Sequence, residues 1–150
     1  MNVLIVDDDK LARKGLVAII DWEKYGFEVV GDVQNGRKAL EFLRNHPVDI
    51  VFTDIDMPEI DGLELMQICG EEFPEIKFVI LSVYENFSYA QTAIRMGALD
   101  YISKISFPRK SVERYWNGSV QSTCRHAEMD MQKRKNRKKL RRKNRKKLKN

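Results

Sequence analysis

Residues 3–9 read VLIVDDD, a run of four apolar residues followed by three aspartates. So short an apolar run is typical of a buried β-strand, and the aspartates mark the point where that strand reaches solvent. A second apolar run leads to Asp54, and a third leads to Lys104. The carboxylates can hold a divalent cation, and the lysine supplies the positive charge that a phosphoryl group needs. We interpret the surrounding sequence as a scaffold that brings these strand ends together.

The first 107 residues alternate between strand and helix patterns five times. Apolar runs that predict strands occupy 3–6, 27–33, 48–53, 78–82 and 99–102. Between them apolar and small residues recur with helical spacing. Strands that are apolar on both sides, such as 50–52, suit a parallel sheet covered by helices on both faces. We therefore expect a doubly wound, five-stranded parallel α/β domain with strand order 2-1-3-4-5.

The expected sheet gathers three aspartates at one edge. In such sheets ligands bind beyond the carboxyl ends of the strands where strand order reverses, which here lies between the first and third strands. Asp7 and Asp8 end the first strand, and Asp54 ends the third. Crowded carboxylates raise one another's pKa unless a cation neutralises them, and Mg²⁺ prefers carboxylate oxygens, a carbonyl and several waters. The sequence therefore predicts a Mg²⁺ site made of these three residues.

Four segments carry a family resemblance. VLIVDDD, VDIVFTDIDMPEIDG, VILS and DYISK occur in order over residues 2–104 and resemble the receiver domains of two-component response regulators. The resemblance implies a flavodoxin-like fold and a cytoplasmic regulator rather than a conventional enzyme. It also implies a sensor histidine kinase as partner and control of transcription as output. A homodimer formed through the fourth helix and fifth strand is a further partner that the resemblance suggests. Residues 11–31 and 82–102 are similar to the subgroup whose full-length members carry an AraC-type DNA-binding output.

The same resemblance implies a role for each predicted site residue. These are the phosphoacceptor Asp54, the acidic metal pair Asp7 and Asp8, Asp56 through its backbone carbonyl, the switch residues Ser82 and Tyr101, and the phosphate-binding Lys104. The chemistry agrees, because a carboxylate that attacks phosphorus needs its own charge offset and the transferring oxygens clamped. Movement of the serine hydroxyl and inward rotation of the tyrosine would then shift an equilibrium between two surfaces.

Two positions depart from the family pattern. Asp56 places an extra carboxylate at the mouth of the site, and this could alter metal binding or phosphoryl lifetime. The family's Lys-Pro is here Lys104-Ile105, and a cis bond before a non-proline residue costs roughly 2.5 to 4 kcal/mol, so we expect a trans bond. Nearby, Asp61-Gly62 is interpreted as a turn and helix cap, since Asp caps helices and Gly permits positive φ.

The last third of the sequence fits the scaffold poorly. We divide the chain into a receiver core (1–107), an atypical stretch with a predicted fifth helix (108–132) and a basic, disordered tail (133–150). The core has 10 Lys and Arg against 19 Asp and Glu, a net charge of −9, whereas the tail has 13 basic residues and no acid. KNRKKL occurs at 135–140 and again at 143–148. A shifted reading frame can explain this repeat, and gene sequencing would test that hypothesis.

Several other classes of function are weighed against the receiver. The tail alone could bind nucleic acid without sequence preference. Asp54-Ile55-Asp56 also resembles the paired aspartates of haloacid dehalogenase phosphatases, but there the pair ends the first strand.

The 43 residues after position 107 are too few for a two-unit DNA-binding output, which needs about 100. The sequence shows no membrane span, and Cys69 and Cys124 give no support for a disulfide or zinc site.

Overall fold

The computed structural model describes residues 1–83 and 86–104, together with single residues between 125 and 139. The latter are helical and exposed; they are Arg125, Met129, Gln132, Lys133, 135–137 and Lys139. The stretch 108–132, which contains the predicted fifth helix, lies outside the described residues except for Arg125, Met129 and Gln132. The bond from Lys104 to Ile105 also lies outside them. Most of the tail lies outside them too, so its disorder and the three-part division of the chain stay predictions.

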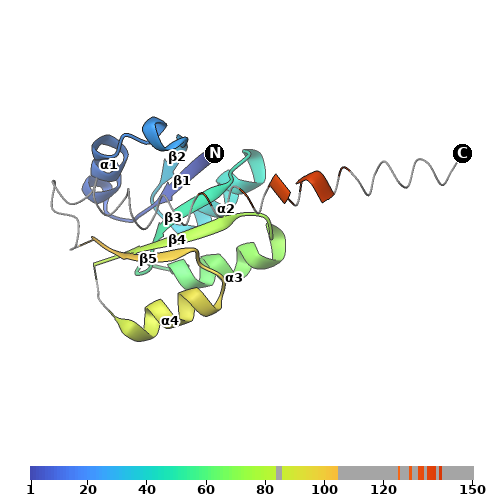
Figure 1. Cartoon of the computed structure of the whole chain (residues 1–150). Helices are drawn as coiled ribbons and strands as arrows, with labels where there is room; N and C mark the ends of the chain where they lie inside the picture. Colours follow the sequence, from blue (N-terminus) through green and yellow to red (C-terminus); the bar gives the residue numbers. More distant parts are fainter. Residues whose placement is uncertain are drawn as a thin grey trace, which may run out of the picture.

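A five-stranded parallel sheet forms the centre of the domain, in the order β2-β1-β3-β4-β5 (Figure 1). The strands are β1 (Asn2–Val6), β2 (Glu28–Val33), β3 (Ile50–Asp54), β4 (Lys77–Ser82) and β5 (Asp100–Ser103). The helices are α1 (Lys10–Ile19), η1 (Glu23–Tyr25), α2 (Gly36–Asn45), α3 (Gly62–Glu72) and α4 (Phe87–Arg95). The predicted fold class and strand order are therefore confirmed, while the strand ends differ from the prediction by a residue or two.

The two faces of the sheet bury separate hydrophobic clusters. One cluster joins alternate strand residues to α2, α3 and α4, and its fully buried members include Leu4, Val51 and Leu65. The other lies on the side of α1 and includes Phe52, whose ring packs edge-on against that of Trp22 with 5.2 Å between the ring centroids. Figure 1 shows α1 on one side of the sheet and α3 and α4 on the other. Burial on both faces explains why the strands are apolar throughout.

A polar side chain caps the start of each described α-helix. Asp9, Asn35, Asp61 and Asn86 accept hydrogen bonds from backbone N–H groups in the first turn of α1, α2, α3 and α4. These caps fix where each strand-to-helix loop ends, because they satisfy N–H groups that the helix itself leaves unpaired. The cap predicted at Asp61 is confirmed.

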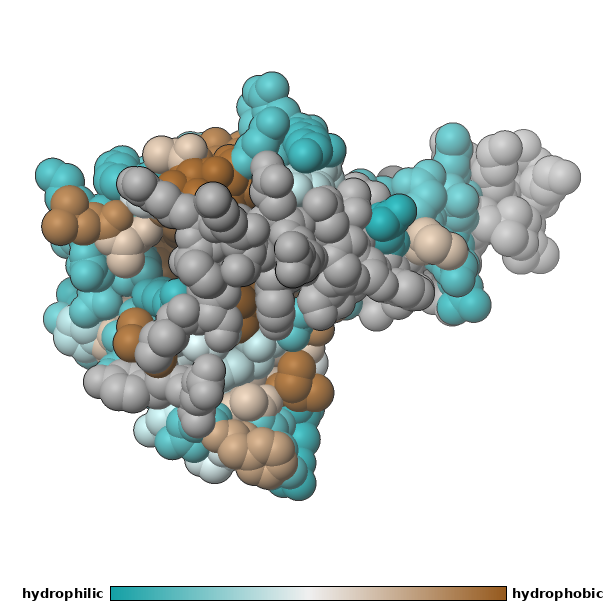
Figure 2. Space-filling model, turned by 60° about the vertical axis from the view of Figure 1, so that its left-hand side comes forward, coloured by the Kyte–Doolittle hydropathy of each residue, from teal (hydrophilic) through white to brown (hydrophobic). Residues whose placement is uncertain are grey.

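The surface of α4 carries exposed hydrophobic side chains. Phe87 is 76% exposed, and Ile94 is 50% exposed. Figure 2 shows hydrophobic side chains at the lower edge of the molecule, which is where α4 lies in Figure 1. Leu11, at the start of α1, is 85% exposed although the helical pattern had placed it with the apolar residues of that helix. Among the described residues, no helix is long and apolar enough to cross a bilayer.

Candidate functional site

Three aspartates converge at the carboxyl ends of β1 and β3, as predicted. Asp7 and Asp8 follow β1 directly, and Asp54 is the last residue of β3. Asp7 and Asp54 are buried, Asp8 is exposed, and one carboxylate oxygen from each lies within 4.8 Å of the others. Such a set of hard oxygen ligands, with one member open to solvent, suits a divalent cation that keeps several waters.

Lys104 reaches the same place from the end of β5. It follows β5, and its Nζ lies 2.5 Å from Oδ2 of Asp7 and 3.3 Å from Oδ2 of Asp54. Its side chain is only 19% exposed, so these contacts are poorly screened by water. The lysine therefore holds its positive charge beside two buried carboxylates. This contact occurs although isoleucine follows Lys104.

The environment of Asp54 makes its carboxyl group harder to ionise than it is in water. Burial raises the pKa of Asp54; the charge of Lys104 opposes this rise, and that of Asp7 adds to it. The carboxylate is held in place because its Oδ1 accepts a hydrogen bond from the Ile55 amide at 2.9 Å. A cation bound at the cluster would offset the cost of ionising this group.

Gly62 lets α3 begin directly against the backbone of Asp54. A Cβ at position 62 would lie 2.3 Å from the carbonyl oxygen of Asp54 and 2.9 Å from Cα of Ile55. The amide of Gly62 also donates to the carbonyl of Ile55 at 2.9 Å. The expectation that this glycine serves a positive φ is wrong. Positive φ occurs at Gly26, Gly97 and Glu59 among the described residues, and at position 62 the need is for space.

A buried arginine supports the site and was missed by the sequence analysis. Arg13 is 8% exposed, and its Nη1 donates to the backbone carbonyl of Asp7 at 2.6 Å. Its Nε donates to Asp32 at 2.9 Å, and Lys14 also contacts Asp32. Burial alone would raise the pKa of Asp32, but hydrogen bonds and charge from Lys14 and Arg13 outweigh it and lower that pKa. An aspartate inside a predicted strand was the available signal, because strands rarely favour Asp.

The remaining predicted residues lie around this cluster rather than in it. Ser82 is fully buried at the end of β4, and Asp54 pairs with its neighbour Leu81 in the sheet. Tyr101 lies within β5, half-buried against the cluster that α2, α3 and α4 cover. Asp56 is exposed at the start of the loop from β3 to α3. The structure thus brings together Asp7, Asp8, Asp54 and Lys104, with the others at the margin.

Most of the sequence matches one protein family. Residues 3–115 match the model of the response regulator receiver domain. The fold and the acidic edge of the sheet agree with this match. The chain belongs to the response regulator receiver domain family, which is a regulatory family and not one of conventional enzymes.

Several relatives are transcriptional regulators. Over 103 residues the chain is 36% identical to the uncharacterized transcriptional regulatory protein YesN of Bacillus subtilis, and this match covers 69% of the chain and 28% of YesN. It is 34% identical to the transcriptional regulatory protein HptR of Staphylococcus aureus, covering 69% of the chain and 40% of HptR. The chain therefore matches less than half the length of these relatives.

Two solved structures of the same kind are similar. The receiver domain of AraT, a response regulator from Geobacillus stearothermophilus, has a TM-score of 0.71 at 34% identity, covering 89% of this chain and 97% of that one. A two-component transcriptional regulator AraC from Clostridium phytofermentans has a TM-score of 0.69 at 30% identity, covering 84% of this chain and 97% of that one. These matches agree with the resemblance to AraC-output regulators.

Proposed function

We propose that this chain receives a phosphoryl group on Asp54 from a sensor histidine kinase, with Mg²⁺ bound by Asp7, Asp8 and Asp54 and by the backbone carbonyl of Asp56. The observation that carries the proposal is the placement of Lys104 Nζ against both Asp7 and Asp54 on top of the acidic cluster. A simple ion pair needs one carboxylate, whereas here one lysine contacts two carboxylates and a third lies beside them, which suits a site that binds further charged groups.

The transfer follows from these positions. An Asp54 carboxylate oxygen attacks phosphorus, the P–N bond to the kinase histidine breaks, and its electron pair returns to the imidazole nitrogen. Lys104 offers its ammonium to the phosphoryl oxygens, while the Ile55 amide fixes the other oxygen of Asp54. Mg²⁺ would supply a second positive charge to the transferring group. Water would later hydrolyse the phosphoryl group from Asp54 without a second enzyme, which is self-dephosphorylation.

The kinase would meet the site at the start of α1. Leu11 is 85% exposed and lies two residues beyond Asp9, which caps this helix beside the acidic cluster. Leu11 would offer the kinase an apolar contact beside the charged site. The kinase histidine would then face Asp54.

The output would be a change of surface. Ser82 and Tyr101 lie on neighbouring strands, β4 and β5, and Tyr101 packs against the cluster that includes Ala93 of α4. Motion of Ser82 toward a phosphoryl group and repacking of Tyr101 would alter the exposed face of α4 and β5. That face is our proposed homodimer surface. In full-length relatives it would control a DNA-binding output, because YesN and HptR are named transcriptional regulators.

Intact-protein mass spectrometry after incubation with acetyl phosphate and Mg²⁺ tests this function. We expect the full chain to gain one phosphoryl group, and we expect Asp54→Asn and EDTA-treated samples to gain none. Lys104→Met should remain folded and react much more slowly. Addition to Asp54→Asn would contradict the assignment of the phosphoacceptor, and no gain by the folded wild-type chain would contradict the proposal itself.

A further inference from the structure

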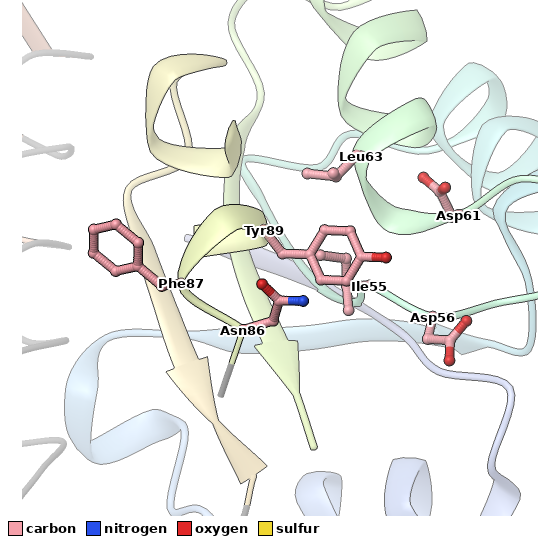
Figure 3. A pocket seen from close by; sticks show the side chains of 7 residues that line it. All are labelled: Ile55, Asp56, Asp61, Leu63, Asn86, Phe87 and Tyr89. Carbon is pink, nitrogen blue, oxygen red and sulfur yellow. The ribbon is translucent and has the colours of Figure 1, made fainter. Parts of the chain in front are cut away.

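A pocket of about 570 Å³ opens beside the acidic site, between the starts of α3 and α4. Seven residues line it: Ile55, Asp56, Asp61, Leu63, Asn86, Phe87 and Tyr89. Figure 3 shows the ring of Tyr89 across the middle of this group, with both aspartates on the side of α3 and Phe87 turned away. The receiver chemistry described above uses Asp56 only through its backbone carbonyl and does not use the rest of the pocket.

The walls of the pocket are chemically different from one another. Asp56 and Asp61 are exposed and place two carboxylates on one wall. Tyr89, 45% exposed, contributes an aromatic ring, and buried Ile55 contributes an apolar side chain. No lysine or arginine is among the described residues that line the pocket. None of the described lining residues therefore neutralises the negative charge of this pocket.

We propose that this pocket binds an arginine side chain presented by a partner protein. A guanidinium is planar and cationic, so it can pair with a carboxylate through its edge while its face stacks on an aromatic ring. The pocket offers both surfaces together with an apolar floor for the methylene stem. Charge complementarity extends beyond the pocket, because residues 1–107 carry a net charge of −9.

Other occupants match the lining less well. A metal ion would gain little from Tyr89, Ile55 and Leu63, which offer no strong ligand beside the two carboxylates. A lysine is a compact point charge and gains less than a guanidinium from a flat ring. A bound arginine would lie close to the acidic site, since Asp56 is two residues beyond Asp54. The inference does not need Asp54 to be phosphorylated, so it can hold or fail separately from the proposed function.

The test is a titration of the full, ¹⁵N-labelled chain with Nα-acetyl-arginine methylamide, followed by amide chemical shifts. Nα-acetyl-citrulline methylamide is the matched control probe, because it has nearly the same shape without the charge. Asp61→Asn is the matched variant: asparagine also caps helices, so the charge is lost while the start of α3 is kept. Tyr89→Leu removes the ring, and Asp54→Asn removes the phosphoacceptor.

We expect saturable shifts at Ile55, Asp56, Leu63 and Tyr89 with the arginine probe and none with citrulline. Asp61→Asn should weaken binding roughly tenfold, as loss of a charged hydrogen bond does, and Tyr89→Leu should weaken it by about fivefold. Asp54→Asn should bind as wild type does. Equal shifts with citrulline, or unchanged affinity in Asp61→Asn, would overturn the proposal. So would amide shifts in the basic residues 133–139 of probe-free Asp61→Asn, because this chain's own tail would then fill the pocket.

Discussion

Two groups of residues surround the acidic edge of the sheet and contact it in different ways. We define the mouth as Asp7, Asp8, Asp54 and Lys104, and the support as Arg13, Asp32 and Gly62. The contacts in the mouth are ion pairs between side chains, because Lys104 Nζ lies within 3.3 Å of two carboxylates. Residues of the support instead contact the backbone of the site: Arg13 donates a hydrogen bond to the carbonyl of Asp7, and Gly62 lies against the carbonyl of Asp54.

The difference separates chemistry from stability. The mouth buries like charges, which costs folding free energy but creates a place for a cation and a phosphoryl group. The support makes hydrogen bonds and close contacts that leave the carboxylate oxygens of Asp7 and Asp54 available. Changes in the support should therefore lower stability, whereas changes in the mouth should slow or abolish phosphorylation and spare the fold.

The largest loss of stability is expected from Gly62→Ala. The new Cβ would meet the Asp54 carbonyl oxygen at 2.3 Å, and this oxygen belongs to the backbone, so it cannot turn aside as the end of a flexible side chain could. We expect the free energy of unfolding to fall by about 3 kcal/mol, measured by urea denaturation. Gly70→Ala in the same helix is the control: a Cβ there meets nothing within 4 Å, so stability should rise by about 0.5 to 1 kcal/mol. Equal effects at the two glycines would remove Gly62 from the support.

Arg13→Met should have the next largest effect. Methionine fills similar space but leaves Asp32 and the carbonyl of Asp7 without their buried donor. We expect a loss of about 2 kcal/mol in urea denaturation, because a paired charge and a buried acceptor each lose a partner. Lys14→Met also removes a cation from Asp32, but its side chain is 58% exposed, so it should change stability by less than about 0.5 kcal/mol. If both variants lose the same stability, burial is not what makes the support different.

The mouth was predictable from sequence, and the support mostly was not. Three aspartates and a lysine at strand ends follow from the alternation of apolar runs, since parallel strands bring their carboxyl ends to one edge. Arg13 lay on a helix whose spacing indicated apolar contact at Leu11, yet Leu11 is exposed and Arg13 is buried. The contact of Arg13 with Asp32 joins α1 to β2, and a one-dimensional pattern does not specify such a long-range pairing. The role of Gly62 was not predictable for the same reason, because it depends on how closely α3 approaches the backbone at the end of β3.

Asp54→Asn, a change in the mouth, should raise stability rather than lower it. Because burial raises the pKa of Asp54, its ionised form costs stability at neutral pH, and the neutral amide removes that cost. We expect the melting temperature in EDTA to rise by a few degrees, the shift that about 1 kcal/mol gives in a domain of this size. Saturating Mg²⁺ should reduce the difference, because it stabilises the wild-type mouth. A lower melting temperature for the variant would show that the contact with Lys104 outweighs burial.

The smallest effect should appear in the pH dependence of stability, where Asp32 and Asp54 act in opposite directions. The pKa of Asp32 is lowered in the folded state, so its contribution is present above the ordinary value of 3.8 and is lost as pH falls through the lowered pKa. Asp32→Asn should therefore cost less than about 1 kcal/mol at neutral pH, and this cost should vanish in acid. The gain in stability from Asp54→Asn should vanish in acid too, because the wild-type carboxyl, with its raised pKa, is then protonated and carries no charge. Urea denaturation of both variants from pH 7 downward should thus give two differences of opposite sign that both shrink as pH falls, with that of Asp32→Asn shrinking only below pH 3.8. Differences of the same sign at pH 7 would mean that mouth and support are not electrostatically distinct.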